Sequence, residues 1–580
     1  MRLLPIAVVS LLCVTTPAWS WETVLPGDGS SGNGASLAVR ADGDLILAHC
    51  IRAKNGSVSR SVVGRFSGRT GKRRWQVTVE RGGFCINPHL VLTAKGDPII
   101  SKPLARLSRR NGTVVWSNRG EGPSALALRA DGSLIATNPS DHSVSALDAS
   151  TGEMLWSTVL DLRPRGIAIQ PGGDVVVTAH GDGGASGPPN PFAVVALDGT
   201  SGAERWRYAA FGTADYINWN DASAIAVDVA GDVVAAGFVS NLLAPPPARD
   251  WDQQPLVVKL AGDSGTERWS RLMPLPGGGD ATPVSAAVTA DGQVVVAINR
   301  YSSSTTVVAK LSGESGDTVW QAAWPGDPDF DDYVEDLTVD AAGDVIAFGT
   351  SAGRVAVRKY VGSSGEPSWH RSLVARSDPL EDFLYPEAVA VDANGSVAVA
   401  GSTQRGGTHA LRLHLIGFRD AVAGKRLAIR DDGARRTIRL ELRDPRIQPA
   451  PAGGAGDPQR EGATLAFASA SGGSLALALP AEGWKPRGSR GGFVYAGTED
   501  GCTAVTWKAG ALRARCASGD DGFTIAEPLG EVSVRLAVGA PQGFSQCAIF
   551  GGTIVADRAA TGGEPGRFTA VDAPPPASCS

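Results

Sequence analysis

Short apolar stretches that turn at a glycine recur along most of this chain. In residues 37–47, for example, apolar positions lie on both sides of a polar turn at Gly43. This pattern predicts two short antiparallel strands joined by a tight turn. Seven further hairpins of the same kind turn at Gly96, Gly132, Gly173, Gly231, Gly292, Gly343 and Gly395. Because one hairpin recurs so often, the sequence predicts a repeat protein built from β-strands.

A second recurring unit places a tryptophan four residues after a glycine. Residues 146–156 predict a strand, a turn that ends at Gly152, and a second strand that carries Trp156. A large indole ring can pack against the neighbouring repeat while its N–H meets a backbone carbonyl. We therefore predict packing between repeats for Trp21, Trp75, Trp116, Trp156, Trp206, Trp269, Trp320 and Trp369. The alternative is that some of these rings line a ligand pocket.

The number of units predicts how the repeats close. Eight hairpins are accompanied by seven glycine–tryptophan units, and no tryptophan follows the strand expected at residues 410–415. Residues 21–24 match the start of the strand at residues 156–159. We therefore expect Trp21 to complete the last blade, which would remove exposed strand edges. The expected fold is all-β, with an eight-bladed β-propeller over residues 21–420 that the N-terminal strand closes.

The glycine–tryptophan units resemble the tryptophan-docking motif of quinoprotein-type β-propellers. The hairpins, such as residues 388–401, resemble the repeats of secreted bacterial propeller proteins. The resemblance implies the fold over residues 21–420, whereas one fold can host many activities. Dehydrogenases of that type usually carry a vicinal disulfide beneath the quinone, and this sequence has no Cys-Cys pair. No cofactor is therefore predicted.

The first 20 residues predict a secretory signal peptide, because Arg2 precedes an apolar run that ends at small residues. Lipid attachment at Cys13 is disfavoured, since no small residue directly precedes it. No other apolar run approaches the ~20 residues that span a bilayer. The net charge of −5 argues against nucleic acid and anionic membranes as partners. We expect a secreted, periplasmic or cell-surface protein.

A chain of 580 residues is expected to hold at least two domains. Residues 421–580 predict a second all-β domain, sandwich-like, which resembles a C-terminal module of secreted proteins from myxobacteria-like bacteria. An even number of cysteines after a signal peptide favours disulfides. We pair Cys50 with Cys85, Cys502 with Cys516, and Cys547 with Cys579. Zinc is disfavoured because no Cys-Xaa2-Cys unit occurs.

The connections that do not turn at glycine are often long. In an up-and-down blade these connections share one face, so we predict that they form the binding face. The candidate contact residues are Tyr216, Trp219, Asp221, Tyr333, Asp336 and Tyr385. Asp327, Asp329, Asp331 and Asp332 could bind Ca²⁺, or a pair of acids could serve as glycosidase acid and base. The alternative is that these acids are solvated surface residues.

These patterns favour a non-enzymatic binding or scaffold protein that holds a protein or a glycan on the long-loop face. The alternative is a propeller enzyme, either a quinoprotein-like oxidoreductase or a carboxylate-based hydrolase or lyase. No catalytic residue is predicted, since the sequence contains no phosphate loop, nucleophile elbow or metalloprotease helix. A third class is a scaffold like the propeller lipoprotein of the outer-membrane barrel-assembly machinery, which the poor lipoprotein signal argues against.

Overall fold

The computed structural model describes most of the chain and divides it into two compact units, Trp21–Phe418 and Arg419–Cys579. The described residues are 21–25, 34–52, 59–68, 70–81, 88–118, 122–181, 190–214, 219–242, 251–273, 280–300, 306–324, 332–351, 354–372, 383–392, 395–404, 411–418, 421–444, 447, 449, 457–487, 491–497, 501–519, 525–538, 544–561 and 564–576.

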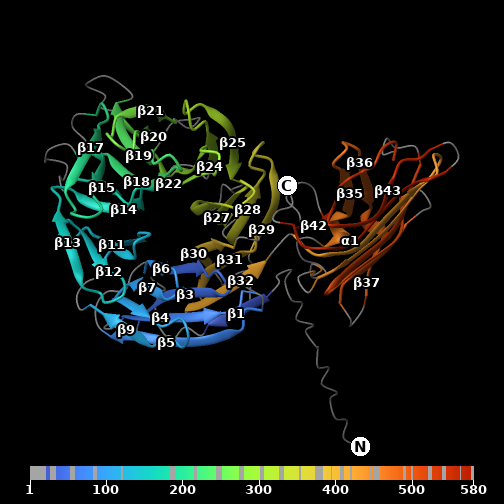
Figure 1. Ribbon diagram of the computed structural model, residues 1–580, viewed down its shortest axis with the longest axis horizontal. Coiled ribbons are helices and arrows are strands. Elements are labelled where there is room, and N and C mark those ends of the chain that lie inside the picture. The colour runs from blue at the N-terminus through green and yellow to red at the C-terminus, as the bar shows by residue number, and fades with distance from the viewer. Residues whose placement is uncertain are drawn as a thin grey trace, which may run out of the picture. The chain divides into compact units, whose positions relative to one another are not determined.

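The first unit is a ring of four-stranded antiparallel sheets (Figure 1). In chain order the strands of the first four sheets are β2 (Ala35–Val39), β3 (Leu45–Arg52), β4 (Ser59–Phe66), β5 (Arg73–Arg81); β6 (Leu90–Leu92), β7 (Pro98–Ser101), β8 (Leu104–Leu107), β9 (Val114–Ser117); β10 (Ala125–Leu128), β11 (Ser133–Asn138), β12 (Ser143–Asp148), β13 (Met154–Val159); β14 (Arg163–Ile169), β15 (Val175–His180), β16 (Phe192–Leu197) and β17 (Glu204–Ala210).

The ring continues with sheets of the same order. Their strands are β18 (Asp221–Val227), β19 (Val233–Leu242), β20 (Trp251–Leu260), β21 (Glu267–Leu272); β22 (Ala281–Val288), β23 (Val294–Arg300), β24 (Thr306–Leu311), β25 (Thr318–Trp324); β26 (Val334–Val339), β27 (Val345–Ser351), β28 (Arg354–Tyr360), β29 (Pro367–Ser372); and β30 (Phe383–Val391), β31 (Val397–Gln404), β32 (Leu411–Phe418) with β1 (Trp21–Leu25). The first strand of a sheet is called the inner strand here, because β14, β18, β22 and β30 lie nearest the centre of the ring (Figure 1). Many four-stranded antiparallel sheets around a centre are the architecture of a β-propeller.

The N-terminal strand β1 belongs to the sheet that ends the unit. It pairs antiparallel with β32, from Trp21 opposite Gly417 to Leu25 opposite Leu413. Thr23 Oγ1 donates a hydrogen bond of 2.7 Å to the carbonyl of Gly71 in the neighbouring sheet. The strands at the two ends of the unit therefore share one sheet.

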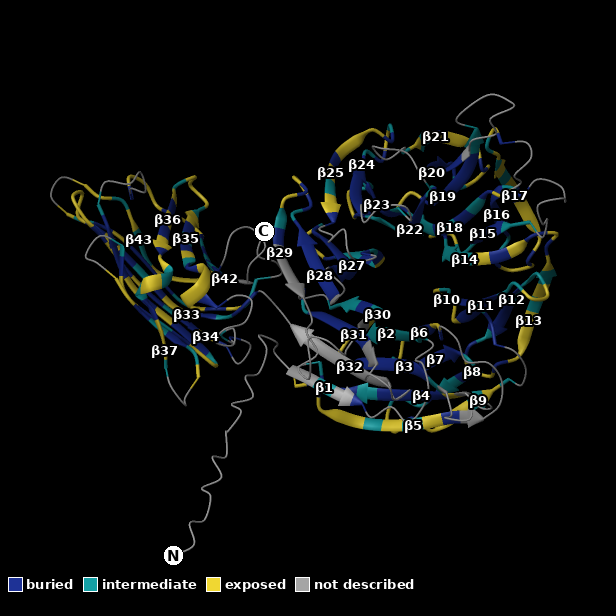
Figure 2. Cartoon of the chain, turned by 180° about the vertical axis from the view of Figure 1, so that it is seen from behind, coloured by how far each residue is buried: buried dark blue, intermediate teal, exposed yellow. Residues whose placement is uncertain are grey.

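The middle strands of the sheets are more deeply buried than the outer ones (Figure 2). Every residue of β16 is buried, whereas exposed and half-buried residues alternate along β13. A middle strand is covered on both faces by neighbouring sheets, so nearly every position must be apolar. The ring is consequently held together by separate small cores between adjacent sheets, such as the cluster that joins Val194 of β16 to Val258 of β20.

Neighbouring sheets are also joined through the tryptophans. Trp206 of β17 is buried, and its Nε1 donates a hydrogen bond of 3.0 Å to the carbonyl of Gly262. Gly265, which lies in the same neighbouring sheet as Gly262, has a φ of 69° and packs against the indole ring of Trp206. The same bond runs from Trp75, Trp116, Trp156, Trp269 and Trp320 to the carbonyls of Arg109, Ala149, Gly199, Gly313 and Gly362. The side chains of Trp21 and Trp369 lie outside the described part.

Replacing Gly265 with alanine is expected to lower the free energy of unfolding by about 2–5 kcal/mol. A Cβ at this position would lie 2.5 Å from the Trp206 ring, so overpacking adds about 1–3 kcal/mol to the roughly 1–2 kcal/mol cost of a left-handed alanine. Gly292→Ala is the matched control, because Gly292 has a φ of 80° with nothing within 4 Å of its Cβ position. Urea unfolding of both variants checks this, and equal losses would contradict a packing role for Gly265.

The second unit contains two antiparallel sheets. The larger has the strand order β37 (Trp484–Pro486), β38 (Phe493–Ala496), β39 (Gly501–Lys508), β40 (Ala511–Ser518), β34 (Arg436–Arg443), β33 (Gly424–Asp431), β44 (Gly566–Ala573), β43 (Thr553–Arg558), and the smaller has the order β36 (Ser474–Leu479), β35 (Ala463–Ser469), β41 (Val532–Val538), β42 (Phe544–Phe550). Apolar side chains from both sheets form one core, with Trp507 and Phe467 among its fully buried members. The polar residues therefore occupy the opposite faces of the sheets.

The remaining features of this unit are short. The helix α1 (Pro458–Glu461) is capped by Asp457, and a 3-10 turn, η1 (Ala481–Gly483), precedes β37. None of the helices in the described segments is long and apolar enough to cross a membrane. A disulfide joins Cys502 of β39 to Cys516 of β40, as predicted. Cys50 and Cys547 are also disulfide-bonded, and the partners predicted for them, Cys85 and Cys579, lie outside the described residues.

Candidate binding face at the N-terminal ends of the inner strands

The inner strands all begin on one face of the ring. Each is joined to its second strand by a short turn at glycine, for example Gly231 between β18 and β19, so the turns occupy the opposite face. The connections between sheets therefore end where the inner strands start. Asp221 is the first residue of β18, Tyr333 directly precedes β26, and Tyr385 lies near the start of β30.

Five successive inner strands have an irregular register close to these ends. The pairing shifts in β14, β18, β22, β26 and β30, at Pro164/Ile167, Ala222/Ala224, Pro283/Ser285, Val334/Asp336 and Pro386/Ala388. A β-bulge inserts an extra residue and changes the direction of its side chain. The bulged positions carry polar side chains in four of the five strands, namely Arg165, Ser223, Glu335 and Glu387.

Arg165 and Asp221 connect two neighbouring inner strands. Arg165 Nη1 of β14 lies 2.6 Å from Asp221 Oδ2 of β18, with side-chain exposures of 49% and 15%. Burial raises the pKa of Asp221, and the nearby Arg165 and His180 oppose that rise. The exposed arginine can therefore contact a ligand while its partner carboxylate holds it in place.

Asp336 is held in the same way by the preceding sheet. Its Oδ1 accepts a 2.8 Å hydrogen bond from Ser285 Oγ of β22 and another of 2.8 Å from the Leu337 amide. Burial raises the pKa of Asp336, although both hydrogen bonds favour its charged form. Burial also raises the pKa of Glu335, and the charge of Asp336 adds to that effect.

Tyr333 lies among acidic groups from two strands. Burial raises the pKa of its phenol to about 12, and the charges of Glu335 and Glu387, with Tyr385, contribute in the same direction. Tyr333 therefore remains a protonated hydrogen-bond donor at neutral pH. We refer to Tyr333, Glu335, Asp336, Tyr385 and Glu387 as the inner-strand cluster.

Exposed aromatic side chains lie on the same face, Phe211 directly after β17, Trp219 shortly before β18 and Tyr385 near the start of β30. The exposed fraction is 59% for Trp219, 55% for Phe211 and 45% for Tyr385. The backbone beside Trp219 is fixed by the buried Asn220, whose Oδ1 accepts from the amides of Gly212 and Ser240, each at 3.0 Å. Trp219 is thus an exposed ring on a firmly anchored segment.

The predicted metal ligands are only partly placed by the structure. Asp327, Asp329 and Asp331, together with Tyr216, lie outside the described residues. Asp332 is buried directly before Tyr333. Among the described side chains, no group of three or more potential ligands is arranged to hold a metal ion.

The sequence analysis placed Asp221, Tyr333, Asp336 and Tyr385 in long connections, and in the structure they lie at or close to the first residues of β18, β26 and β30. Arg165 and Glu387 were not among the predicted residues. Both missed residues follow a proline that precedes the bulge, at Pro164 and Pro386. A proline near the start of a strand that otherwise alternates is a signal for a bulge. The recurring Pro-Xaa pattern could therefore have indicated these positions.

Asp336→Asn is expected to raise the melting temperature at pH 7 and to leave it nearly unchanged at pH 3. The raised pKa of Asp336 means that the folded state favours the neutral carboxyl over the charged one. The neutral carboxyl therefore contributes its full stability below the ordinary pKa of 3.8, and this contribution is lost as pH rises through the folded pKa. Asparagine keeps the Oδ1 acceptor for Ser285 and Leu337 without the charge. Melting curves between pH 3 and pH 8 check this.

Asp148→Asn is the control, and its expected change in melting temperature at pH 7 has the opposite sign. Hydrogen bonds from Ser150 and Thr151 lower the pKa of Asp148, so its contribution is present above pH 3.8 and is lost in acid. That variant should therefore lower the melting temperature at pH 7. A destabilised Asp336→Asn at pH 7 would contradict the assignment of a disfavoured charge at Asp336.

A family model described as outer membrane protein assembly factor BamB matches residues 59–254 and again residues 250–432. No curated protein matches the chain. BamB from Moraxella catarrhalis is 16% identical, covering 56% of this chain and 95% of that chain, with a TM-score of 0.36.

Two other solved structures are similar at comparable levels. The Dos1 propeller is 11% identical over 69% of this chain and 95% of that chain, with a TM-score of 0.44. A quinohemoprotein alcohol dehydrogenase from Comamonas testosteroni is 12% identical over 70% of this chain and 76% of that chain, with a TM-score of 0.43. Because the two family matches together cover more than half of its residues, the chain belongs to the family of PQQ-like β-propeller repeat proteins described as outer membrane protein assembly factor BamB.

Proposed function

We propose that this is a non-enzymatic binding protein that holds a protein partner on the face where the inner strands begin. The observation that carries the proposal is the group of exposed aromatic side chains, Phe211, Trp219 and Tyr385, on the same face as the exposed Arg165. Tryptophan, tyrosine and arginine contribute most of the binding energy at protein interfaces. The family description names an assembly factor for outer membrane proteins, which favours a protein over a glycan as partner.

We also propose an architecture and a location that fit this role. The sheets of residues 21–420 would be the eight blades of one propeller closed by β1, residues 421–580 a sandwich-like domain, and residues 1–20 a cleaved signal peptide. The pairing of β1 with β32 and the common core of the two C-terminal sheets support this arrangement. The protein would then act in the periplasm, on the cell surface or outside the cell.

The proposal predicts that the double variant Trp219→Ala, Tyr385→Ala loses partners that the wild type retains. The mature chain would be cross-linked in envelope extracts of its own organism, and the captured proteins quantified by mass spectrometry. Removing two aromatic anchors is expected to reduce capture of a specific partner by at least about tenfold. Val229→Ala is the matched control, because Val229 is 79% exposed and lies in the turn on the opposite face. Equal capture by all three proteins would contradict the proposal.

A carboxylate-based hydrolase or lyase is the second candidate. It is favoured by the raised pKa of Glu335 beside Asp336, because a raised pKa favours the protonated form that a general acid needs. Hydrolysis of a glycan panel that is abolished by Glu335→Gln would support this enzyme. Melting-temperature titrations with Ca²⁺ and with pyrroloquinoline quinone test the two other ligands. A calcium shift lost in Asp329→Asn would indicate a metal-binding loop, and a quinone shift would favour an oxidoreductase.

A further inference from the structure

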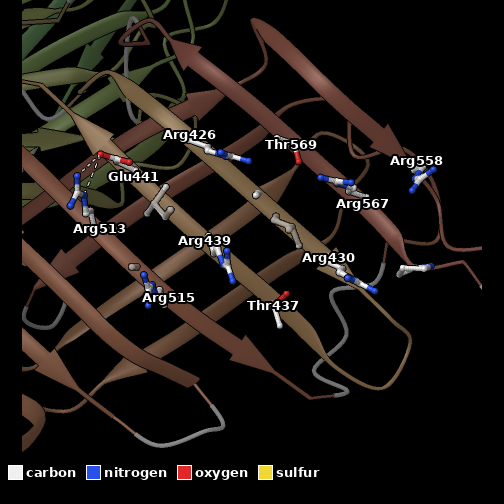
Figure 3. A pocket seen from close by; sticks show the side chains of 15 residues that line it. Arg426, Arg430, Thr437, Arg439, Glu441, Arg513, Arg515, Arg558, Arg567 and Thr569 are labelled. Atoms are coloured by element: carbon white, nitrogen blue, oxygen red, sulfur yellow. Dashed lines mark hydrogen bonds and ion pairs between the residues drawn. The ribbon is translucent and has the colours of Figure 1, made fainter.

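The larger sheet of the second unit presents a strongly basic surface on the face opposite its core. Along β33 the side chains of Leu427 and Ile429 are buried, whereas those of Arg426 and Arg430 are exposed. The same alternation continues through β34 and β40. Figure 3 shows arginine side chains from neighbouring strands gathered on this face.

This face is hollowed into a pocket of about 770 Å³ that seven arginines line. Ala428 is one of the lining residues and is opposite Arg439 of β34 on one side and Thr569 of β44 on the other. Because alanine carries only a methyl group, the longer side chains around it form the walls. Arginine side chains therefore make up much of the pocket lining.

The register of the sheet places several of these arginines directly opposite one another. Arg430 of β33 is opposite Arg567 of β44, which in turn is opposite Arg558 of β43. Arg439 of β34 is opposite Arg515 of β40. Like charges at directly opposite positions destabilise a sheet. An arrangement that repeats this unfavourable pairing is expected to be compensated by a bound anion.

The protein itself supplies little negative charge here. Glu441 is the carboxylate that lines the pocket, and it is already engaged by Arg513 at 2.9 Å and by Arg443 at 2.6 Å. Arg558 lies 3.5 Å from Glu564. Within the part of the chain that the structure describes, no carboxylate lies within ion-pair distance of the other five lining arginines: Arg426, Arg430, Arg439, Arg515 and Arg567.

A buried hydroxyl provides an independent indication of a ligand. Thr569 lines the pocket and is only 4% exposed, yet its Oγ1 has no hydrogen-bond partner among the described residues. A buried hydroxyl without a partner carries a desolvation cost that folding alone does not recover. A small rotation of the side chain toward the pocket would bring this hydroxyl to an acceptor oxygen of a bound ligand.

We propose that the pocket binds a multiply phosphorylated anion. Five unpaired guanidinium groups exceed what one carboxylate can neutralise, whereas each phosphate monoester carries about −1.5 to −2 charges and three acceptor oxygens. Arginine pairs with phosphate through two parallel hydrogen bonds, which fits planar groups that converge from several strands. Because the whole chain has a net charge of −5, the electrostatic attraction for an anion is local to the pocket.

The first test measures binding of inorganic tripolyphosphate to the full mature chain by calorimetry. Arg430→Gln with Arg567→Gln is expected to weaken binding at least about tenfold, because two charged hydrogen-bond donors are lost. The pair Lys485→Gln with Lys508→Gln is the control: it removes equal charge from exposed positions of the same sheet, outside the pocket lining, and should change affinity less than about threefold. No binding by the wild type, or equal weakening in both pairs, would overturn the proposal.

Thr569→Val separates binding from folding. Valine preserves the volume but removes the unpaired hydroxyl, so the melting temperature is expected to hold while tripolyphosphate binding weakens by roughly tenfold. Citrate, which carries carboxylates in place of phosphates, should bind at least about tenfold more weakly than tripolyphosphate. Unchanged affinity in Thr569→Val, or citrate binding as tight as that of tripolyphosphate, would contradict a phosphate site.

Vesicles distinguish the two sources of such an anion. Sedimentation with phosphatidylcholine vesicles that contain phosphatidic acid, reversed by tripolyphosphate, would assign the pocket to phosphorylated lipid headgroups. Tripolyphosphate binding without vesicle binding would assign it to a free oligophosphate. Both results require the loss of binding in the Arg430/Arg567 variant, and vesicle binding that survives in that variant would overturn the proposed site.

Discussion

A chain that begins at residue 26, and so lacks β1, is expected to lose at least about 5 kcal/mol of stability relative to one that begins at Trp21. The deletion removes the backbone pairing of Trp21–Leu25 with β32, at about 1 kcal/mol for each hydrogen bond. It also removes Leu25, which packs with Leu45, Leu47 and Phe66 in the core between two sheets, at about 2–5 kcal/mol.

The same deletion exposes the full edge of β32, which is a template for pairing with other chains. We therefore expect a lower melting temperature accompanied by concentration-dependent association, measured by calorimetry and light scattering. Thr23→Val is the control, since it removes only the hydrogen bond to Gly71 and should cost about 1 kcal/mol. A truncated chain that melts like the Thr23→Val variant and stays monomeric would show that β1 does not hold the ring closed.

Lys359→Met is expected to lower the free energy of unfolding by about 3–5 kcal/mol. Lys359 Nζ of β28 lies 2.8 Å from Asp340 Oδ2 and 3.0 Å from Asp344 Oδ2. The three side chains are at most 3% exposed, so removing the ammonium group leaves two buried carboxylates close together without a cation. Urea unfolding of the full chain measures the loss.

The control for this prediction removes the carboxylates as well. In the triple variant Lys359→Met, Asp340→Asn, Asp344→Asn, the asparagine Oδ1 atoms can still accept from the amides of Ala342 and Gly362. Much of the lost stability should return, because no unpaired charge remains in the interior. A triple variant as unstable as Lys359→Met would mean that the packing of the lysine stem, and not its charge, determines the cost.

The spacing of glycine and tryptophan was sufficient to predict a β-propeller, because both residues act locally. Gly265 needs only a positive φ in one turn, and Trp269 is a large ring four residues later in the same unit. The disulfide between Cys502 and Cys516 was predictable for the same reason, since one hairpin brings the two residues together.

The candidate site was less predictable. Asp221, Tyr333 and Tyr385 follow from where the strands begin, which the sequence pattern indicates. The hydrogen bond between Ser285 and Asp336, and the ion pair between Arg165 and Asp221, each connect different sheets. They depend on which inner strands are neighbours and on bulges that shift the register, so local periodicity could not indicate them.

The basic pocket shows the same division most clearly. The sequence by itself determined that Arg426 and Arg430, or Arg513 and Arg515, occupy one face of their strands, because side chains alternate along a strand. Only the tertiary structure decided that β40, β34, β33, β44 and β43 lie side by side. Strand order depends on how distant segments bury a common core, and that long-range packing is what gathers separate arginines into one anion-binding pocket.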